Sequence, residues 1–162
     1  MELSLMQQNS PDGSSSKQFH SPQPYAEYSF DEMTLGVNES FEVEVTEDML
    51  QQFATLSGDY NPLHVNDKYA ESTSFRRKIC HGSLLVSFFS RMIGMYLPGK
   101  YALFLSLNVE FVAPCYIGDQ ITVRGTIIQK SNSTKIVTIK LSITNQTGRQ
   151  LTSGEAKILM RK

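Results

Sequence analysis

Three things are scarce in this 162-residue sequence: cysteine, net charge and uninterrupted apolar stretches. The formal net charge of -1 at pH 7 provides no overall attraction for nucleic acid or for an anionic membrane surface. The two cysteines, Cys80 and Cys115, are far apart and lie in neither a CxxC motif nor a metal-ligand cluster, and a disulfide between them stays open on the sequence. This pattern is typical of reduced thiols in the cytoplasm. We therefore expect a cytoplasmic protein without a nucleic-acid partner.

The longest apolar stretch, residues 84–97, is interrupted by serine, arginine and glycine and is too short to cross a bilayer. The N-terminal residues lack a basic region followed by an apolar one, and no arginine precedes Arg76, which argues against a targeting peptide. No membrane association is expected. Hydrophobic residues at 40% and charged residues at 19% suit one globular domain with a buried core.

The N-terminal segment differs from the rest in composition. Residues 7–25 are polar, contain repeated serine and proline, and have too little apolar content to order themselves. We predict a flexible arm over residues 1–28 and a single domain over residues 29–162. Aromatic residues near the end of the arm, such as Tyr28, could dock part of it on the domain or on a partner subunit.

A strand and a helix are predicted next. Residues 41–45 alternate between apolar and acidic side chains, which is the period of a half-buried strand. Thr46 can cap a following helix whose first turn is acidic, and Gly58 is typical of a helix end. We expect this helix to deliver Asp59 into a loop.

Residues 57–64 read Ser-Gly-Asp-Tyr-Asn-Pro-Leu-His and place a carboxylate, Asp59, five residues before an imidazole, His64. Pro62 disfavours the helical conformation at Asn61, so the backbone is expected to follow a fixed irregular path. An imidazole titrates near neutral pH, and a nearby carboxylate can orient it or share a water molecule with it. The pair is therefore a candidate acid–base pair. The alternative is that Asp59 caps a turn and His64 binds a backbone group.

The second important element is an apolar helix predicted over residues 83–97 and closed by Pro98-Gly99. Apolar side chains lie around nearly its whole circumference, so we expect protein to surround it. Small residues recur along it at helical spacing and permit close approach by a sheet or a slender ligand. These residues are Ser83, Ser87, Ser90 and Gly94. At the start of the helix, the backbone N–H of Gly82 is unpaired and can donate to a developing negative oxygen.

The remaining third of the chain contains four alternating runs, at residues 103–111, 121–127, 137–143 and 151–160. Each run predicts a strand with one apolar face, and the short connections between successive strands indicate antiparallel pairing. The apolar face of the sheet must be buried against another element, and the apolar helix is the element that can bury it. We therefore predict an α+β domain in which an antiparallel sheet is wrapped around a long central helix.

Several motifs together resemble the MaoC-like (R)-specific enoyl-CoA hydratases, also called hydratase 2. The motifs are residues 54–64, His81-Gly82, Leu97-Pro98-Gly99, Phe111-Val112-Ala113-Pro114 and Gly118-Asp119. They occur in the order of the family, between about residue 35 and the C-terminus. The resemblance implies a hot-dog fold, a homodimer whose sheets join edge to edge, and reversible hydration of trans-2-enoyl-CoA to (R)-3-hydroxyacyl-CoA. It implies no metal and no redox cofactor.

The resemblance also implies roles for individual residues. Asp59 and His64 would be the acid–base pair, Asn61 and Ser90 would orient water or catalytic groups, and Gly82 would donate its amide to the thioester oxygen. As a hypothesis, Leu84, Met92 and Ile93 bound the acyl chain. The cations Arg76, Arg77 and Lys78 either form a solvated turn or meet phosphates on the carrier of the substrate.

Other functions remain open on the sequence. A 3-hydroxyacyl-[acyl carrier protein] dehydratase of fatty-acid or polyketide assembly would use the same residue pair. A non-catalytic hot-dog module that binds acyl groups is a second alternative, although the joint presence of Asp59, Asn61 and His64 argues against it. A thioesterase is a weaker one.

Overall fold

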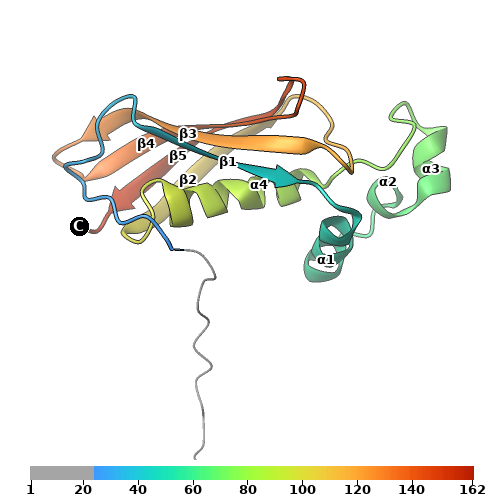
Figure 1. Ribbon diagram of the computed structural model, residues 1–162. Helices are drawn as coiled ribbons and strands as arrows, with labels where there is room; N and C mark the ends of the chain where they lie inside the picture. Colours follow the sequence, from blue (N-terminus) through green and yellow to red (C-terminus); the bar gives the residue numbers. More distant parts are fainter. Residues whose placement is uncertain (1–23) are drawn as a thin grey trace, which may run out of the picture.

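The computed structural model describes residues 24–162, in which one sheet is covered on one face by a long helix (Figure 1). Its strands are β1 (Asn38–Glu44), β2 (Ala102–Phe111), β3 (Gln120–Ser131), β4 (Ile136–Thr144) and β5 (Gln150–Met160). Its helices are α1 (Glu47–Ser57), α2 (Pro62–Val65), α3 (Asp67–Ser72), α4 (Gly82–Arg91) and the π-helical turn η1 (Met92–Tyr96). Residues 1–23, which contain most of the predicted arm, lie outside the described residues. Within residues 24–162, no helix has the length and apolar character to cross a bilayer.

All neighbouring strands are antiparallel, in the order β1-β3-β4-β5-β2. The strands β3, β4 and β5 follow one another through short turns, as the sequence predicts. All the helices lie in the chain between β1 and β2, which form the two edges of the sheet. The arrangement is the predicted hot-dog fold, with one long helix, α4 continued by η1, running along the sheet (Figure 1).

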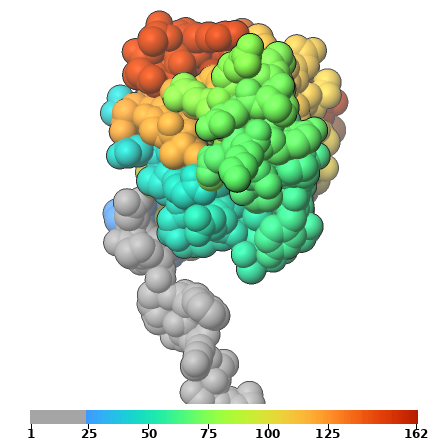
Figure 2. All heavy atoms as spheres, turned by 90° about the vertical axis from the view of Figure 1, so that its right-hand side faces the viewer, coloured from blue at the N-terminus to red at the C-terminus, as the bar shows by residue number. Residues whose placement is uncertain are grey.

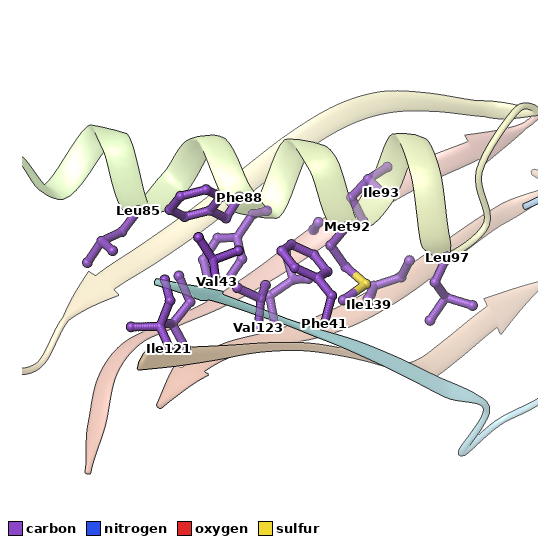
Figure 3. Packing of buried hydrophobic residues seen from close by; sticks show 14 of the residues in the cluster. Phe41, Val43, Leu85, Phe88, Met92, Ile93, Leu97, Ile121, Val123 and Ile139 are labelled. Carbon is purple, nitrogen blue, oxygen red and sulfur yellow. The ribbon is translucent and has the colours of Figure 1, made fainter. Parts of the chain in front are cut away.

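The core lies between α4 and the sheet (Figure 3). The helix contributes Phe88 and Met92, which face inward-pointing side chains such as Val123 and Ile139. Gly125 on β3 makes room for this packing, because a Cβ there would lie 3.1 Å from Cγ of Met92. Burying a side chain of this size contributes about 1.5–3 kcal/mol. The same contacts fix the rotation of α4 and therefore the direction of its first residues.

The sheet covers only one side of α4, so the expectation that protein surrounds this helix is wrong for the single chain. The small residues form a stripe that is exposed on the side away from the sheet; these are Ser83, Ser87, Ser90 and Gly94. Because short side chains expose little apolar area to water, exposure of this side of the helix costs little free energy. The stripe therefore does not serve as the contact between helix and sheet.

The predicted ends of α1 are confirmed. The Oγ1 atom of Thr46 accepts a hydrogen bond from the amide of Met49 at 3.3 Å, and Glu47 and Asp48 occupy the first turn. Gly58 ends the helix in the left-handed conformation, with φ of 76°, which glycine adopts without steric cost. The reversal directs the chain into the loop that carries Asp59.

Residues 24–28, the end of the predicted arm, are paired with the domain. The amide of Ala26 donates to the carbonyl of Met95 at 2.8 Å, and the amide of Lys100 donates to the carbonyl of Ala26 at 2.9 Å. The hydroxyl of Tyr28 donates to Glu39 at 2.8 Å. This short segment therefore holds the turn that follows η1.

The pairing of this segment depends on Gly99, which has φ of 84° and whose Cβ position would overlap the carbonyl oxygen of Ala26. We predict that Gly99→Ala lowers the free energy of unfolding by about 2 kcal/mol or more, because alanine is strained in this conformation and displaces that carbonyl. Urea unfolding at fixed protein concentration measures the change. The control is Gly94→Ala, whose Cβ meets nothing within 4 Å. Equal midpoints for the two variants would contradict the prediction.

Candidate active site

His64 lies in the one-turn helix α2, which Asn61 caps. The Oδ1 atom of Asn61 accepts from the amide of Leu63 at 3.0 Å. The imidazole is half-buried, and its Nδ1 atom lies 2.8 Å from the carbonyl oxygen of Ile79. Since a carbonyl oxygen can only accept, Nδ1 carries the proton, and in the neutral ring Nε2 has a free lone pair. His64 is therefore oriented to accept or return a proton through Nε2.

Asp59 follows the glycine that ends α1 and is exposed to solvent. Its Oδ1 atom accepts from the amide of Asn61 at 3.2 Å. A carboxylate oxygen of Asp59 and nitrogens of His64 and His81 all lie within 4.8 Å of one another. The structure thus brings the two predicted residues together, on either side of the turn at Asn61.

The third member of this cluster, His81, is a residue to which the sequence reasoning gave no role. Its side chain is 1% exposed, and Nε2 lies 3.0 Å from the backbone carbonyl oxygen of Asp59. Its ring centroid is 4.0 Å from that of His64, with 30° between the planes. The signal that could have identified it is its place directly before Gly82.

Asp59, His64 and His81 are also the residues of the described chain that could together hold a metal ion. A metal centre needs lone pairs that converge on one point about 2 Å from each donor atom. The two rings are tilted by 30°, and one nitrogen of each is bonded to a backbone carbonyl oxygen, Nδ1 of His64 to Ile79 and Nε2 of His81 to Asp59. Nε2 of His64 and the Asp59 carboxylate remain for proton transfer.

Gly82 begins α4, directly after His81. Its amide has no hydrogen-bond partner within residues 24–162. The first amides of a helix point away from it and carry a partial positive charge, so this N–H can polarise a carbonyl oxygen. A Cβ at this position would lie 2.8 Å from the ring of Phe111, which packs over the start of the helix.

His64 and Gly82 line the same pocket, which has a volume of about 480 Å³. Its remaining walls come mainly from apolar side chains of residues 75–85 and 111–115. Asp59 does not line the pocket, although its carboxylate is close to His64. Figure 2 shows this end of the molecule, where α1, α2 and α3 form the surface below the β4–β5 turn. The pocket offers a proton-accepting nitrogen and a backbone donor in apolar surroundings.

The structure places the predicted acyl-binding residues elsewhere. Leu84 lines a separate cavity of about 260 Å³ between α1 and α4, whereas Met92 and Ile93 are buried in the core against the sheet. Met92 is ten residues after Gly82, which corresponds to roughly 15 Å along a helix. Ser90 is exposed on the side of α4 away from the sheet. Leu85, the residue after Leu84, lines the pocket that contains His64 and Gly82.

Of the three adjacent cations, Lys78 is already paired. Its Nζ lies 2.8 Å from Glu47 and 3.4 Å from Asp67, and the hydrogen bond to Glu47 raises the pKa of Lys78. The guanidinium of Arg77 lies 3.9 Å from the ring centroid of Tyr116, and Arg76 is exposed with φ of 62°. Lys78 therefore holds α1 and α3 together, and the two arginines are the cations that can meet a phosphate.

Comparison with known proteins identifies the family of the chain and its fold. The model of the MaoC like domain family matches residues 32–147. The (R)-specific enoyl-CoA hydratase of Aeromonas caviae is 38% identical over 106 residues, which cover 65% of this chain and 79% of that protein. A mitochondrial 3-hydroxyacyl-[acyl-carrier-protein] dehydratase of Arabidopsis thaliana is 38% identical over 72 residues, 44% of this chain and 42% of that one. The solved R-hydratase of Pseudomonas aeruginosa is similar in structure, with a TM-score of 0.78 and 32% identity. The matched region covers 82% of this chain and 84% of that one.

Two free thiols form part of the pocket wall. Cys80 and Cys115 are both buried, and the amide of Cys80 donates to the carbonyl of Cys115 at 2.7 Å. The neighbouring Cys80 thiol, together with burial, raises the pKa of Cys115 far above its usual value. Cys115 is therefore a protonated, unreactive wall residue and not a nucleophile.

The raised pKa of Cys115 makes stability depend on pH. Above about pH 8.5 the thiol ionises in the unfolded chain but keeps its proton in the folded one, so the folded state loses stability as pH rises. We predict that the free energy of unfolding, measured in urea at pH 7.5, 8.5 and 9.5, falls more steeply for the wild type than for Cys115→Ala. The difference approaches about 1.4 kcal/mol per pH unit at the upper end. Parallel pH curves would show that the thiol titrates normally.

Proposed function

The chain belongs to the MaoC-like domain family, and we propose that it is an (R)-specific enoyl-CoA hydratase. Such an enzyme adds water reversibly to trans-2-enoyl-CoA and forms (R)-3-hydroxyacyl-CoA. The observation that carries the proposal is that His64 and Gly82, whose amide has no partner among residues 24–162, line one apolar pocket, with the carboxylate of Asp59 beside His64. Hydratases and dehydratases among the relatives place the chain with the hydro-lyases that act on thioesters.

Hydration of an enoyl thioester needs a base for the attacking water, a proton for the α carbon, and a donor for the negative charge on the thioester oxygen. Asp59 and His64 are close enough to share one water molecule and to carry out both proton transfers. The amide of Gly82 supplies the donor at the start of α4. Each of the three chemical tasks therefore has a group in the proposed site.

The apolar walls of the pocket have two uses in this proposal. They accept the acyl carbons next to the thioester, and they exclude bulk water, which strengthens the hydrogen bond from Gly82 to a developing oxyanion. Phosphates of the carrier would be met by Arg76 and Arg77, which follow the pocket residue Phe75. Lys78 is left out because its charge is engaged by Glu47 and Asp67.

The carrier of the acyl group has two candidates. The similarity to the plant dehydratase favours acyl carrier protein as a second possibility, because both substrates present the same thioester to the same residues. Kinetics with crotonyl-CoA and with the crotonyl thioester of acyl carrier protein separate the two. Release of free thiol without hydration would instead indicate a thioesterase, and binding without turnover would indicate a non-catalytic module.

We propose that the enzyme is a homodimer joined through β2. This strand is an edge of the sheet, and several large apolar side chains along it and just beyond its end are exposed. They are Leu103, Phe104, Leu105, Phe111 and Val112. An edge strand with unpaired backbone groups and apolar side chains is a ready surface for a second copy of the chain.

The acid–base assignment predicts that Asp59→Asn and His64→Gln each lower kcat by about 10²- to 10⁴-fold, because each removes a group that transfers a proton. The assay is loss of enoyl-thioester absorbance with crotonyl-CoA, with chiral analysis of the 3-hydroxyacyl product. The double variant should be little slower than the slower single variant, because the two residues act as one unit.

Asp31→Asn is the matched control, since Asp31 lies in a pocket beside Arg161 and Lys162 and away from His64. It should retain the wild-type kcat. Wild-type turnover in either site variant would contradict the assignment, and an (S) product would contradict the proposed function.

The dimer proposal predicts that Leu105→Lys yields a monomer. Leu105 is 48% exposed and lies at the irregularity where the β2–β5 register shifts, so a lysine there disturbs no pairing within the chain. Light scattering after size-exclusion chromatography should give twice the chain mass for the wild type and a single chain mass for the variant. Leu35→Lys, at a position that is 67% exposed outside β2, should remain dimeric. An unchanged mass for Leu105→Lys would place the interface elsewhere.

A further inference from the structure

His81 contacts or adjoins all three parts of the proposed site. Its Nε2 atom donates to the backbone carbonyl of Asp59 at 3.0 Å, and its ring packs against that of His64 at a centroid distance of 4.0 Å, with 30° between the planes. The peptide bond that follows His81 contains the N–H of Gly82, the proposed oxyanion donor. One buried side chain thus connects the loop after α1, the helix α2 and the start of α4.

We propose that His81 is a positioning residue that holds Asp59, His64 and the Gly82 amide in one catalytic geometry. The inference rests on the proposed hydratase function, because it assigns a role within that reaction. His81 does not itself transfer a proton in this proposal. It acts through the backbone of Asp59, while its ring packs beside that of His64.

The loop that carries Asp59 needs such a support. Its residues from Gly58 to Asn61 belong to no helix or strand and are exposed. The amide of Asp59 donates to Oγ of Ser57 at 3.2 Å, and Oδ1 of Asp59 accepts from the amide of Asn61. Both bonds join Asp59 to residues two positions away, so neither attaches the loop to the rest of the domain. The bond from His81 attaches Asp59 to α4, which is fixed by the core. A displacement of about 1 Å at a reacting group can cost about 100-fold in rate.

The hydrogen bonds of the two ring nitrogens of His81 decide which replacements can test its positioning role. Because the carbonyl of Asp59 accepts, Nε2 must carry a proton, and in the neutral ring Nδ1 is then a bare acceptor. Nδ1 is buried and has no hydrogen-bond partner among the described residues. Replacement by phenylalanine therefore keeps an aromatic ring against His64 and Phe53 while removing a single hydrogen bond. Replacement by glutamine keeps an N–H donor near the position of Nε2 and removes the ring.

The experiment compares the wild type, His81→Phe and His81→Gln, using the full chain. Steady-state hydration of crotonyl-CoA provides kcat and KM, and thermal unfolding measures how well each variant folds. We expect His81→Phe to lower kcat by about 10- to 100-fold with KM within about threefold, because the substrate pocket is kept while Asp59 is displaced. His81→Gln should recover kcat to within about fivefold of the wild type.

A residue needed only for folding would lower the unfolding temperature and the active fraction without this selective loss and recovery of kcat. Wild-type kcat in His81→Phe, a loss expressed mainly in KM, or a glutamine variant as slow as the phenylalanine variant would each overturn the inference.

A second measurement does not depend on activity and so separates this inference from the proposed function. Long-range ¹H–¹⁵N spectra of the histidine side chains report which ring nitrogen carries the proton. In the wild type we expect the Nδ1–H form for His64 and the Nε2–H form for His81. In His81→Phe we expect the backbone amide signals of residues 58–61 to shift, because their bond to His81 is lost, while His64 keeps its Nδ1–H form. If no thioester is hydrated by the wild type, the proposed function fails and these spectra decide the positioning role alone. Unchanged backbone amide signals of residues 58–61 in His81→Phe would overturn it.

Discussion

The hydrogen bond from Nδ1 of His64 to the carbonyl of Ile79 is the interaction on which the proposed site depends. A four-residue helix such as α2 has no stability of its own, so an outside contact must hold its histidine in place. Ile79 is itself held, because its amide donates to the carbonyl of Leu63, and the next residue, Cys80, pairs with Cys115. The same bond selects the tautomer of His64 and leaves Nε2 as the reactive atom. Position and protonation state are thus set by one contact.

The proposed site combines a rigid part with parts that must be fastened to it. Gly82 belongs to α4, whose inward side chains pack against the sheet, so its amide has a fixed direction (Figure 3). Asp59 and His64 lie on a loop and a single helical turn outside the core. Their geometry relative to Gly82 comes from hydrogen bonds to Ile79 and from His81, both just before α4 in the chain. The start of α4 is therefore the reference point for the whole arrangement.

The features that sequence predicts best are those decided by local chemistry. Thr46 caps α1 as expected, and Gly58 ends it, because each acts on residues within one turn. The meeting of Asp59 and His64 is likewise a local consequence of the turn at Asn61. The pairing of Lys78 with Glu47 joins residues 31 positions apart and has no local signature. The inward rotation of Met92 was missed as well. The stripe of small residues provides a phase, but small side chains suit both close packing and exposure, so the stripe alone does not say which side meets the sheet.

The burial of the two catalytic candidates differs in a way that suits their proposed tasks. Asp59 is exposed and outside the pocket, whereas His64 is half-buried and lines it. On the proposed function, water can reach the carboxylate from solvent while the thioester enters the apolar pocket and meets His64 and Gly82. Since the groups that deliver the hydroxyl and the proton then lie on one side of the double bond, a substrate held by its oxygen at Gly82 exposes a single face to them. A fixed oxyanion contact and one-sided proton transfer together account for a single stereochemical product.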